Sequence, residues 1–378
     1  DNLNLSSVTV DGTLDVTTST GHDFSIINGQ GTIRMSGDGG TSNFPDGTTT
    51  TSNGFGNPAN GGLLIVEGAL EFDEVEVFKD VRIQTPSATD IVSLGSDLTI
   101  NGNLDVRFGT FEFGDGTATN RTLDVLGNFS VENNGGSQDG RVTTAVATGT
   151  RHEFNLYGDF LNEGIAQFSD RTSAVFGSES NSGVVDLNLI STNRNQRIDC
   201  NGLTYFYRIE VDKQSTQFIA DIQADAQGNF VLTGPANYGI GGDVLVPSDN
   251  QNAMGLITGS VSIGTNVRVR LNTTGNYSVG TNAKLIVSGG EVTKTGGAAI
   301  TPYGIIEVTA GVLEVPSGSG ITNRSTGQIN ISGGEIWTCQ IRTSIQGVGA
   351  QGGFQQTGGV VNVWDYSAAE SPILGQAA

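Results

Sequence analysis

Apolar and polar residues alternate in short runs along the chain, and each run ends near a glycine. In the N-terminal half one seven-residue pattern recurs as VTVDGTL, LIVEGAL, LTINGNL, LDVLGNF and FNLYGDF, at Val8–Leu14, Leu64–Leu70, Leu98–Leu104, Leu123–Phe129 and Phe154–Phe160. A period of two is typical of a β-strand with one buried face, and the glycine permits a sharp bend between two strands. The pattern therefore predicts pairs of short strands joined at a glycine corner.

The C-terminal half repeats more evenly. Its GGEV, AGVL, GGEI and GGVV segments place glycines at 290, 311, 334 and 359, and a second interlocking set places them at 280, 304 and 327. Two phase-locked sets that share one period indicate several strands per repeat, and no helical pattern accompanies them. We therefore predict an all-β fold, a right-handed parallel β-helix with roughly 21–25 residues per coil. A series of immunoglobulin-like sandwiches is the rival architecture.

Three polar or glycine-rich stretches interrupt this rhythm and suggest the domain organisation. We expect an irregular β-helix over 1–222 with inserted loops at about 37–62 and 133–151. A junction is expected at 223–252, a regular β-helix at 253–366 and a tail at 367–378. The chain starts at Asp1 and shows no obvious polar cap, so we expect a segment of a longer protein whose flanking regions are its neighbours.

Composition and charge narrow the function classes. The 378 residues include 56 glycines and carry a formal net charge of −21. An acidic surface repels phosphate backbones and anionic membranes, which argues against nucleic-acid partners, and the sequence has no apolar run of transmembrane length. We expect a secreted, extracellular protein, which such a charge would keep soluble. The same charge can attract Ca²⁺.

Few residues have the character of a catalytic centre. Histidine occurs only at His22 and His152, and we expect both to be solvated surface residues. Cys200 and Cys339 form no metal-ligand or disulfide pattern, and each is expected to fill a core position as a small hydrophobe. No nucleophile elbow, zinc motif or phosphate loop is present, so we expect no enzyme and no cofactor.

Carboxylates support the alternative of a polysaccharide lyase or hydrolase of the β-helix class. Asp105 with Arg107, and Asp124 one coil later, are expected to align on a single sheet, and Asp15 occupies the same motif position as Asp105. The competing interpretation is that these residues are outward strand positions kept polar for solubility.

Weak binding candidates lie in turns and in one aromatic strand. Asp38, Asp46, Asp115 and Asp139 are candidate calcium ligands in short acidic turns, although Asp-Gly turns need no metal. Tyr205, Tyr207 and Arg208 form a candidate ligand platform, in which alternation would turn both tyrosines outward and Phe206 into the core. The tryptophans Trp337 and Trp364 lie in regular coils, where they either pack or are exposed.

Several stretches together resemble the large β-helical surface proteins of Bacteroidota that the type IX secretion system exports. The resemblance is carried by GQGTIRMSGDGGTSNFPDG at Gly29–Gly47, by LTINGNLDV, LGNFSVENNG and YGDFLNEGIAQFSD, and by INISGGEIWTCQIRTS and GGFQQTGGVVNV. It implies a role in adhesion or gliding motility, with the secretion machinery and surface glycans or a substratum as partners. It supplies no catalytic residues, and an internal segment of such a protein is expected to lack the family's export-targeting C-terminal domain.

The sequence thus predicts a structural and adhesive module of a large cell-surface protein. A polysaccharide-degrading enzyme is one alternative, and a phage or viral fibre, which should be trimeric, is another.

Overall fold

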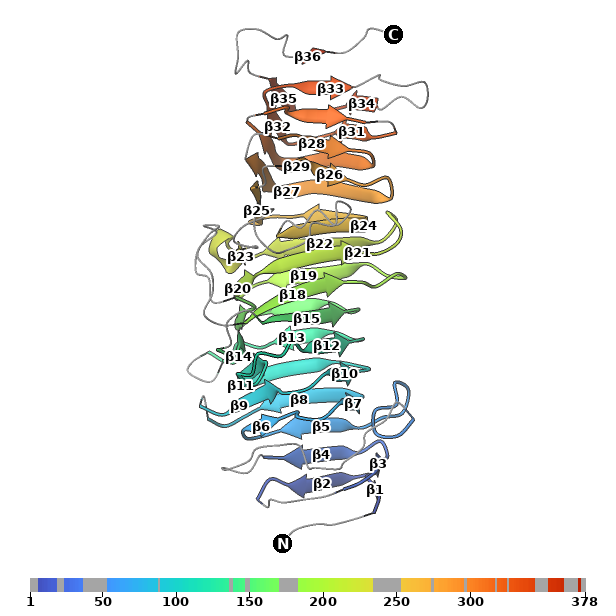
Figure 1. Ribbon diagram of the computed structural model, residues 1–378, viewed down its shortest axis with the longest axis vertical. Helices are drawn as coiled ribbons and strands as arrows, with labels where there is room; N and C mark the ends of the chain where they lie inside the picture. The colour runs from blue at the N-terminus through green and yellow to red at the C-terminus, as the bar shows by residue number, and fades with distance from the viewer. Residues whose placement is uncertain are drawn as a thin grey trace. The chain divides into compact units, whose positions relative to one another are not determined.

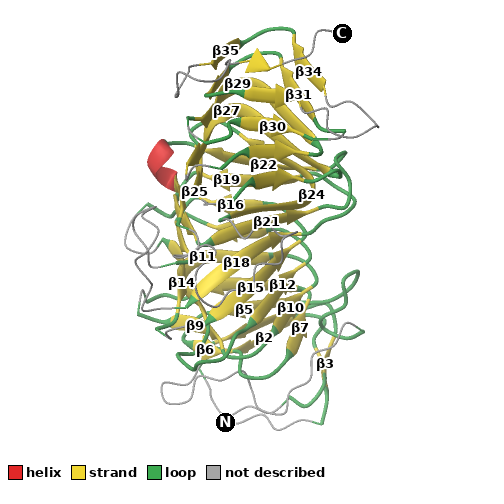
Figure 2. Ribbon diagram, turned by 45° about the horizontal axis from the view of Figure 1, so that its top comes forward, coloured by secondary structure: helices red, strands yellow, loops and turns green. Residues whose placement is uncertain are grey.

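The structure is a computed structural model that describes fourteen stretches of the chain. They are residues 6–18, 24–36, 53–87, 89–135, 139–146, 150–169, 183–233, 253–272, 275–295, 298–316, 318–324, 326–343, 353–363 and 373–374. Within these stretches the protein is almost entirely strand and loop, with one short 3-10 helix, η1 (Gln227–Asn229) (Figure 2). The prediction of an all-β fold is confirmed.

The chain forms two compact units, and segments between Asn188 and Arg208 belong alternately to one unit and the other. Unit 1 comprises 1–172, 179–188 and 200–207, and unit 2 comprises 173–178, 189–199 and 208–378. The junction expected at 223–252 therefore falls inside unit 2, where 234–252 lie outside the described residues.

Unit 1 contains nineteen described strands wholly or mostly within it. They are β1 (Val8–Thr9), β2 (Thr13–Val16), β3 (Ile27–Asn28), β4 (Thr32–Met35), β5 (Leu63–Val66), β6 (Leu70–Glu71), β7 (Glu76–Phe78), β8 (Asp80–Gln84), β9 (Ile91–Leu94), β10 (Leu98–Ile100), β11 (Leu104–Phe113), β12 (Thr122–Val125), β13 (Phe129–Val131), β14 (Gly140–Thr144), β15 (Arg151–Leu156), β16 (Phe160–Asn162), β17 (Ile165–Gln167), β18 (Val184–Leu189) and β20 (Leu203–Phe206).

β1 and β3 pair with each other in a separate two-stranded sheet, and the other strands form three parallel arrays (Figure 1). The first sheet is β2-β4-β5-β8-β11-β13-β16. The second is β6-β9-β11-β14-β17-β20, and the third is β7-β10-β12-β15-β18. Each sheet pairs one coil of chain with the next, as Leu98 pairs with Leu123 and Leu123 with Phe154.

Glycines at the corner before the first sheet let successive coils approach closely. A Cβ on Gly127 would lie 2.4 Å from the carbonyl oxygen of Gly102, and one on Gly158 would lie 1.9 Å from that of Gly127. Real Cβ atoms do not come that close to backbone, so only glycine fits. The predicted stacking of these three glycines is confirmed, and Gly12, Gly31 and Gly62 belong to the same corner.

Side-chain oxygens at this corner complete the backbone hydrogen bonding from coil to coil. Asp80 Oδ1 accepts a hydrogen bond from the N–H of Asn103 at 2.7 Å, and Asn103 Oδ1 accepts one from Asn128 at 2.8 Å. Asn128 Oδ1 accepts one from the N–H of Asp159 at 2.9 Å. We call Asp80, Asn103, Asn128 and Asp159 the corner ladder. It satisfies amides that the sheet ladders leave unpaired.

Phenylalanine rings fill the interior of unit 1. Phe129 of the first sheet, Phe113 of the second and Phe154 of the third are all fully buried. The ring of Phe154 lies 5.1 Å from that of Phe129 and 5.8 Å from that of Phe113, centroid to centroid. The three sheets therefore share one aromatic core, whose tilted and edge-on contacts are favourable ring geometries.

Unit 2 contains the remaining strands and η1. The strands are β19 (Gln196–Cys200), β21 (Arg208–Asp212), β22 (Ile219–Ala224), β23 (Phe230–Leu232), β24 (Met254–Ile263), β25 (Arg268–Asn272), β26 (Tyr277–Val279), β27 (Ala283–Thr295), β28 (Ile300–Pro302), β29 (Ile305–Val315), β30 (Ile321–Asn323), β31 (Gln328–Ile331), β32 (Glu335–Thr338), β33 (Ile341–Thr343), β34 (Gly353–Gln356), β35 (Val360–Val363) and β36 (Ile373–Leu374).

Three parallel arrays also run through the regular part of unit 2. They are β22-β24-β27-β29-β31-β34, β25-β27-β29-β32-β35 and β26-β28-β30-β33-β36. The long strands β27 and β29 bend at Gly290 and Gly311, so each contributes to two arrays. Gly311 has φ +77°, and a Cβ there would lie 2.2 Å from the carbonyl oxygen of Gly290. The core here is aliphatic, as in the buried column Leu285–Ile306–Ile329.

The pairing supports a β-helix and not the sandwich alternative. Every registered strand pairing among the described residues is parallel, and the only antiparallel contact there is an isolated bridge between Leu94 and Gly114. Immunoglobulin-like sandwiches consist of antiparallel strands. The large parallel sheets are those that a β-helix requires.

Three local predictions differ from the structure. The Leu64–Leu70 motif lies at another corner, since its first strand joins the first sheet and its second strand joins the second sheet. The segment predicted as a loop at 133–151 contains strand β14, whose Val142 is buried. In the described part of the loop predicted at 37–62, the side chain of Phe55 is fully buried, so this part is anchored in the core.

Candidate functional site

The outward face of the first sheet of unit 1 carries a row of polar side chains that only Ile65 interrupts. Register aligns Asp15, Arg34, Ile65, Arg82, Asp105 and Ser130 across six neighbouring strands. Alternation turns their strand neighbours, such as Ile33 and Ile83, into the core. We call the charged and amide side chains of this face the polar ladder. Its members are Asp15, Arg34, Glu67, Arg82, Gln84, Asp105, Arg107 and Glu132.

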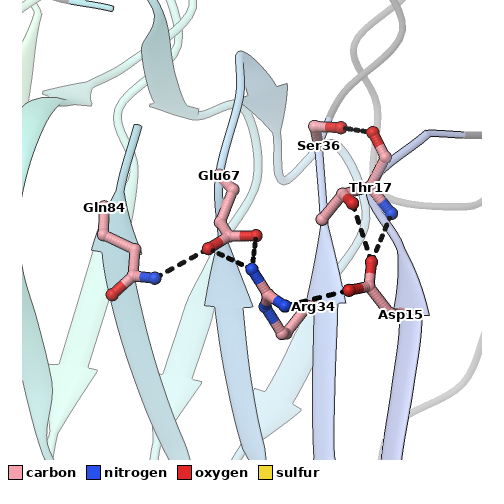
Figure 3. A network of polar contacts seen from close by, with 6 residues as sticks. All are labelled: Asp15, Thr17, Arg34, Ser36, Glu67 and Gln84. Atoms are coloured by element: carbon pink, nitrogen blue, oxygen red, sulfur yellow. Dashed lines mark hydrogen bonds and ion pairs between the residues drawn. The ribbon is translucent and has the colours of Figure 1, made fainter. Parts of the chain in front are cut away.

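The N-terminal half of the polar ladder is centred on Arg34 (Figure 3). Its guanidinium lies 2.9 Å from Asp15 Oδ2 and donates to both oxygens of Glu67, at 2.9 and 2.8 Å. Glu67 Oε1 also accepts a hydrogen bond from Gln84 Nε2 at 2.8 Å. One guanidinium nitrogen, Nη2, reaches both oxygens of Glu67 while Nη1 reaches Asp15, so Arg34 links two carboxylates by charge-assisted hydrogen bonds.

The C-terminal half is centred on Asp105. Asp105 Oδ2 lies 3.2 Å from Nε of Arg82 and 2.8 Å from Nε of Arg107, and Oδ1 accepts a hydrogen bond from Ser130 at 3.0 Å. Arg107 also lies 3.4 Å from Glu132. Acidic and basic groups therefore alternate along the ladder, and each charge is neutralised by a neighbour.

Local contacts and burial shift the pKa values of the ladder groups Asp15, Arg107 and Glu132. Hydrogen bonds from Thr17 hold the pKa of Asp15 below its usual value, with a further contribution from the charge of Arg34. The hydrogen bond to Asp105 raises the pKa of Arg107. Desolvation raises the pKa of the Glu132 carboxyl, and the charge of Asp105 acts in the same direction.

The carboxylates considered for catalysis do not converge. Asp15 and Asp105 lie on the first sheet as expected, but three strands separate them. The expectation that Asp124 aligns with Asp105 is wrong, because β12 belongs to the third sheet. There Asp124 Oδ1 accepts a hydrogen bond from Asn155 at 2.8 Å. A period of two identifies the outward face of a strand but not the sheet to which the strand belongs.

The calcium candidates that can be located are engaged within the protein. Asp115 Oδ1 accepts hydrogen bonds from the backbone and hydroxyl of Thr117, and Asp115 Oδ2 lies 3.0 Å from Arg121. Asp139 Oδ1 accepts a hydrogen bond from the N–H of Asn134 at 3.0 Å. Asp38 and Asp46 lie outside the described residues. The described stretches contain no group of three or more His, Cys, Asp or Glu residues placed to hold a metal ion.

The aromatic candidates are split by a bend. Phe206 is buried as expected, but β20 ends there, and Tyr207 is only 8% exposed with the Arg151 guanidinium 5.6 Å from its ring centre. Tyr205 is half-buried. Arg208 is also buried and pairs with Glu210 at 2.6 Å. The two tyrosines therefore do not form one exposed platform, because the turn after Phe206 ends the alternation.

The prediction that His152 is a solvated surface residue is wrong. The side chain lies on an inward position of β15 and is 1% exposed. Its Nδ1 accepts a hydrogen bond from the N–H of Arg121 at 3.1 Å, whereas its Nε2 has no partner among the described residues. Burial lowers its pKa to about 4, and the charge of Arg121 acts in the same direction. His22 lies outside the described residues.

Cys200 and Cys339 do not form a disulfide with each other. Cys200 is fully buried, as expected of a small core residue. Cys339 is only half-buried, and its Sγ lies 3.5 Å from the carbonyl oxygen of Gly318. It is therefore not the core residue that was expected.

Comparison with known proteins adds no assignment. No family model, curated protein or solved structure matches this chain. Among the described residues, no helix has the length and apolar character that crossing a membrane requires.

Proposed function

We propose that this chain is a structural and adhesive module of a large secreted cell-surface protein, built as a right-handed parallel β-helix. Export by the type IX secretion system and a role in adhesion or gliding motility follow from the resemblance described above. The module acts as a stiff scaffold and not as an enzyme. Neighbouring parts of the same protein, and glycans or a substratum, are its partners.

The observation that carries this proposal is the way outward polar groups are used. Along the polar ladder, Arg34 and Asp105 join neighbouring strands to one another. A catalytic face would instead point carboxylates at a shared cleft, with their charges left for a substrate. Pairing along a flat parallel sheet gives a water-compatible surface and keeps the strands in register.

An adhesion assay tests the proposal. The purified chain is coupled to beads, and detachment under flow is measured on bare glass and on polysaccharide-coated glass, with albumin-coated beads as the reference. We expect the chain to retain beads on at least one surface more strongly than albumin does. Retention equal to that of albumin on both surfaces would contradict the adhesive role.

A parallel measurement addresses the alternatives. Incubation with a polysaccharide panel should release no reducing ends and no unsaturated products, and sedimentation should give a monomer. Release of oligosaccharides would instead support a lyase or hydrolase, and a trimer would support a fibre segment.

A further inference from the structure

The array β25-β27-β29-β32-β35 of unit 2 exposes a tryptophan on its outward face. Alternation in β32 buries Ile336 and Thr338 and turns Trp337 outward, where it is half-buried. Register places Glu314 beside Trp337 on one neighbouring strand and Asn362 beside it on the other. Large aromatic side chains usually lie in cores or binding surfaces, so an indole on an outward sheet position requires an explanation.

The neighbours of Trp337 form a small apolar surface with polar groups around it. Two residues earlier on each strand, the outward row contains Val312, Glu335 and Val360 in register, and Val360 is 48% exposed. These valines lie diagonally to Trp337, within reach of a large ring across a sheet. We call Val312, Glu314, Glu335, Trp337, Val360 and Asn362 the tryptophan face.

Polar atoms of the tryptophan face have unused hydrogen-bonding capacity. The side-chain amide of Asn362 has no partner among the described residues, and Glu314 has only a 3.4 Å contact, between its Oε2 and the Thr293 hydroxyl. Glu335 Oε2 accepts a hydrogen bond from Trp337 Nε1 at 2.6 Å, which fixes the indole and leaves Oε1 without a partner in the described chain. This contrasts with the polar ladder, where the charges are paired with one another.

We propose that the tryptophan face binds a neutral polysaccharide chain. A sugar ring has an apolar C–H face that can lie on the indole and a rim of hydroxyls that can donate to carboxylates and pair with a carboxamide. The outward rows here carry Glu291, Glu314 and Glu335 against Arg268, which pairs with Glu291 at 3.0 Å, and Arg270, so the area keeps a net negative charge. This charge disfavours uronate and sulfate polymers and favours uncharged hydroxyl-rich ones. The inference rests on the proposed adhesive function and specifies its ligand class.

Calorimetric titration of the full chain tests the inference. The probes are hexasaccharides of β-linked glucose, xylose and N-acetylglucosamine, with hexagalacturonate as the anionic comparator. We expect saturable binding of at least one neutral probe, weaker binding of hexagalacturonate, and at least about a tenfold loss of affinity in Trp337→Ala. The matched control is Tyr157→Ala, which removes an exposed aromatic residue of unit 1 and should bind as the wild type does.

Further variants separate loss of the site from loss of folding. Asn362→Ala and Glu314→Gln change only partly exposed polar groups, and each should weaken binding by roughly threefold or more. In the Trp364→Phe chain Trp337 is the single tryptophan, so its emission should shift as the bound probe saturates.

The inference would be overturned by no binding of any neutral hexasaccharide, by preferential binding of hexagalacturonate, or by wild-type affinity in both Trp337→Ala and Asn362→Ala. Calorimetric binding without a change in Trp337 emission would also overturn it, because the ligand would then lie elsewhere. Bead retention that persists in Trp337→Ala would leave the adhesive function standing and remove only this site.

Discussion

The two units use the same parallel architecture but fill it with different side chains. Unit 1 packs phenylalanine rings from three sheets, with centroids 5.1 to 6.1 Å apart in the cluster around Phe154. The regular part of unit 2 packs aliphatic columns such as Leu285–Ile306–Ile329. Coil lengths are less even in unit 1, where the pairing of Leu123 with Phe154 encloses a longer stretch of chain, and the pairing of Leu63 with Asp80 a shorter one, than the pairing of Lys284 with Ile305 in unit 2. Strand stacking therefore fixes the fold, while the core chemistry varies with the regularity of the coil.

The largest expected effect is the loss of one ring from the aromatic core. Phe154→Ala should destabilise unit 1 by about 3–5 kcal/mol, because the three sheets that meet at this ring cannot all relax into the cavity. Ile329→Val in unit 2 is the comparison and should cost about 0.5–1.5 kcal/mol. Hydrogen exchange followed by mass spectrometry reports both, and faster exchange in β12, β13 and β15 is expected for Phe154→Ala. Uniform acceleration across both units would contradict separate cores.

The stability cost of replacing a corner glycine by alanine should depend on the backbone geometry and the space at that glycine. Gly311→Ala should cost about 2–5 kcal/mol, because it combines overpacking with a left-handed backbone of φ +77°. Gly127→Ala lacks the positive φ and should cost about 1–3 kcal/mol. Gly12 lies at the same corner as Gly127 with nothing within 4 Å of an added Cβ, so Gly12→Ala is the matched control and should be nearly neutral. Urea denaturation gives the order, and equal costs for Gly127 and Gly12 would refute the stacking explanation.

Acid should weaken unit 1 through His152, whereas unit 2 contains no histidine. The unfolded chain binds a proton at this residue near pH 6.5, but the folded chain does so only at a pKa of about 4. Stability is therefore lost as the pH falls from about 6.5 to 4, by at most about 3 kcal/mol.

The test compares thermal melting at pH 7 and pH 4.5 in the wild type and in His152→Gln. The drop should shrink in His152→Gln and persist in the control His22→Gln. Glu71 and Glu112, whose pKa values are raised by burial, titrate in all three chains, so the comparison isolates His152. An unchanged drop in His152→Gln would mean that other groups carry the acid sensitivity.

The smallest effect is expected on the polar ladder. Arg34→Gln should lower the melting temperature only slightly, since its partners are partly exposed and solvent screens the pair. Near 1 M NaCl the difference from the wild type should vanish, because the screening length falls to about 3 Å. A loss that persists in high salt would show that the packing of the Arg34 stem, and not its charge, matters.

Sequence pattern predicted the strand alternation and the glycine corners, since each depends on neighbours close in sequence. It predicted the coil-to-coil stacking because the same pattern recurs along the chain. It could not assign Leu64–Leu70 or Asp124 to the correct sheet, because every corner of a coil presents the same local pattern. His152 shares the inward face of β15 with Phe154 and Leu156, so extending the alternation by two residues would have predicted its burial. Its contacts with Phe113 and Gly183 come from distant coils and could not be predicted in this way.

The sequence alone predicts only part of the tryptophan face. Trp337 occupies an outward position in the alternation of EIWT, so its orientation follows from the period of two. Its neighbour Glu314 lies one coil earlier in the chain and its neighbour Asn362 one coil later, and only the exact register brings them beside it. Coil lengths that vary from repeat to repeat hide such alignments from the sequence.

The corner ladder has a consequence for how such a chain grows. Asn103 and Asn128 each donate an N–H to the preceding coil and accept at the side-chain oxygen from the following one, so a duplicated coil of this kind carries both halves of the joint it needs. Tandem duplication of a gene segment can therefore lengthen the stack without inventing a new interface. Because donors face one way and acceptors the other, a copied coil fits in only one orientation. All coils therefore follow one another in the same direction, however many are added.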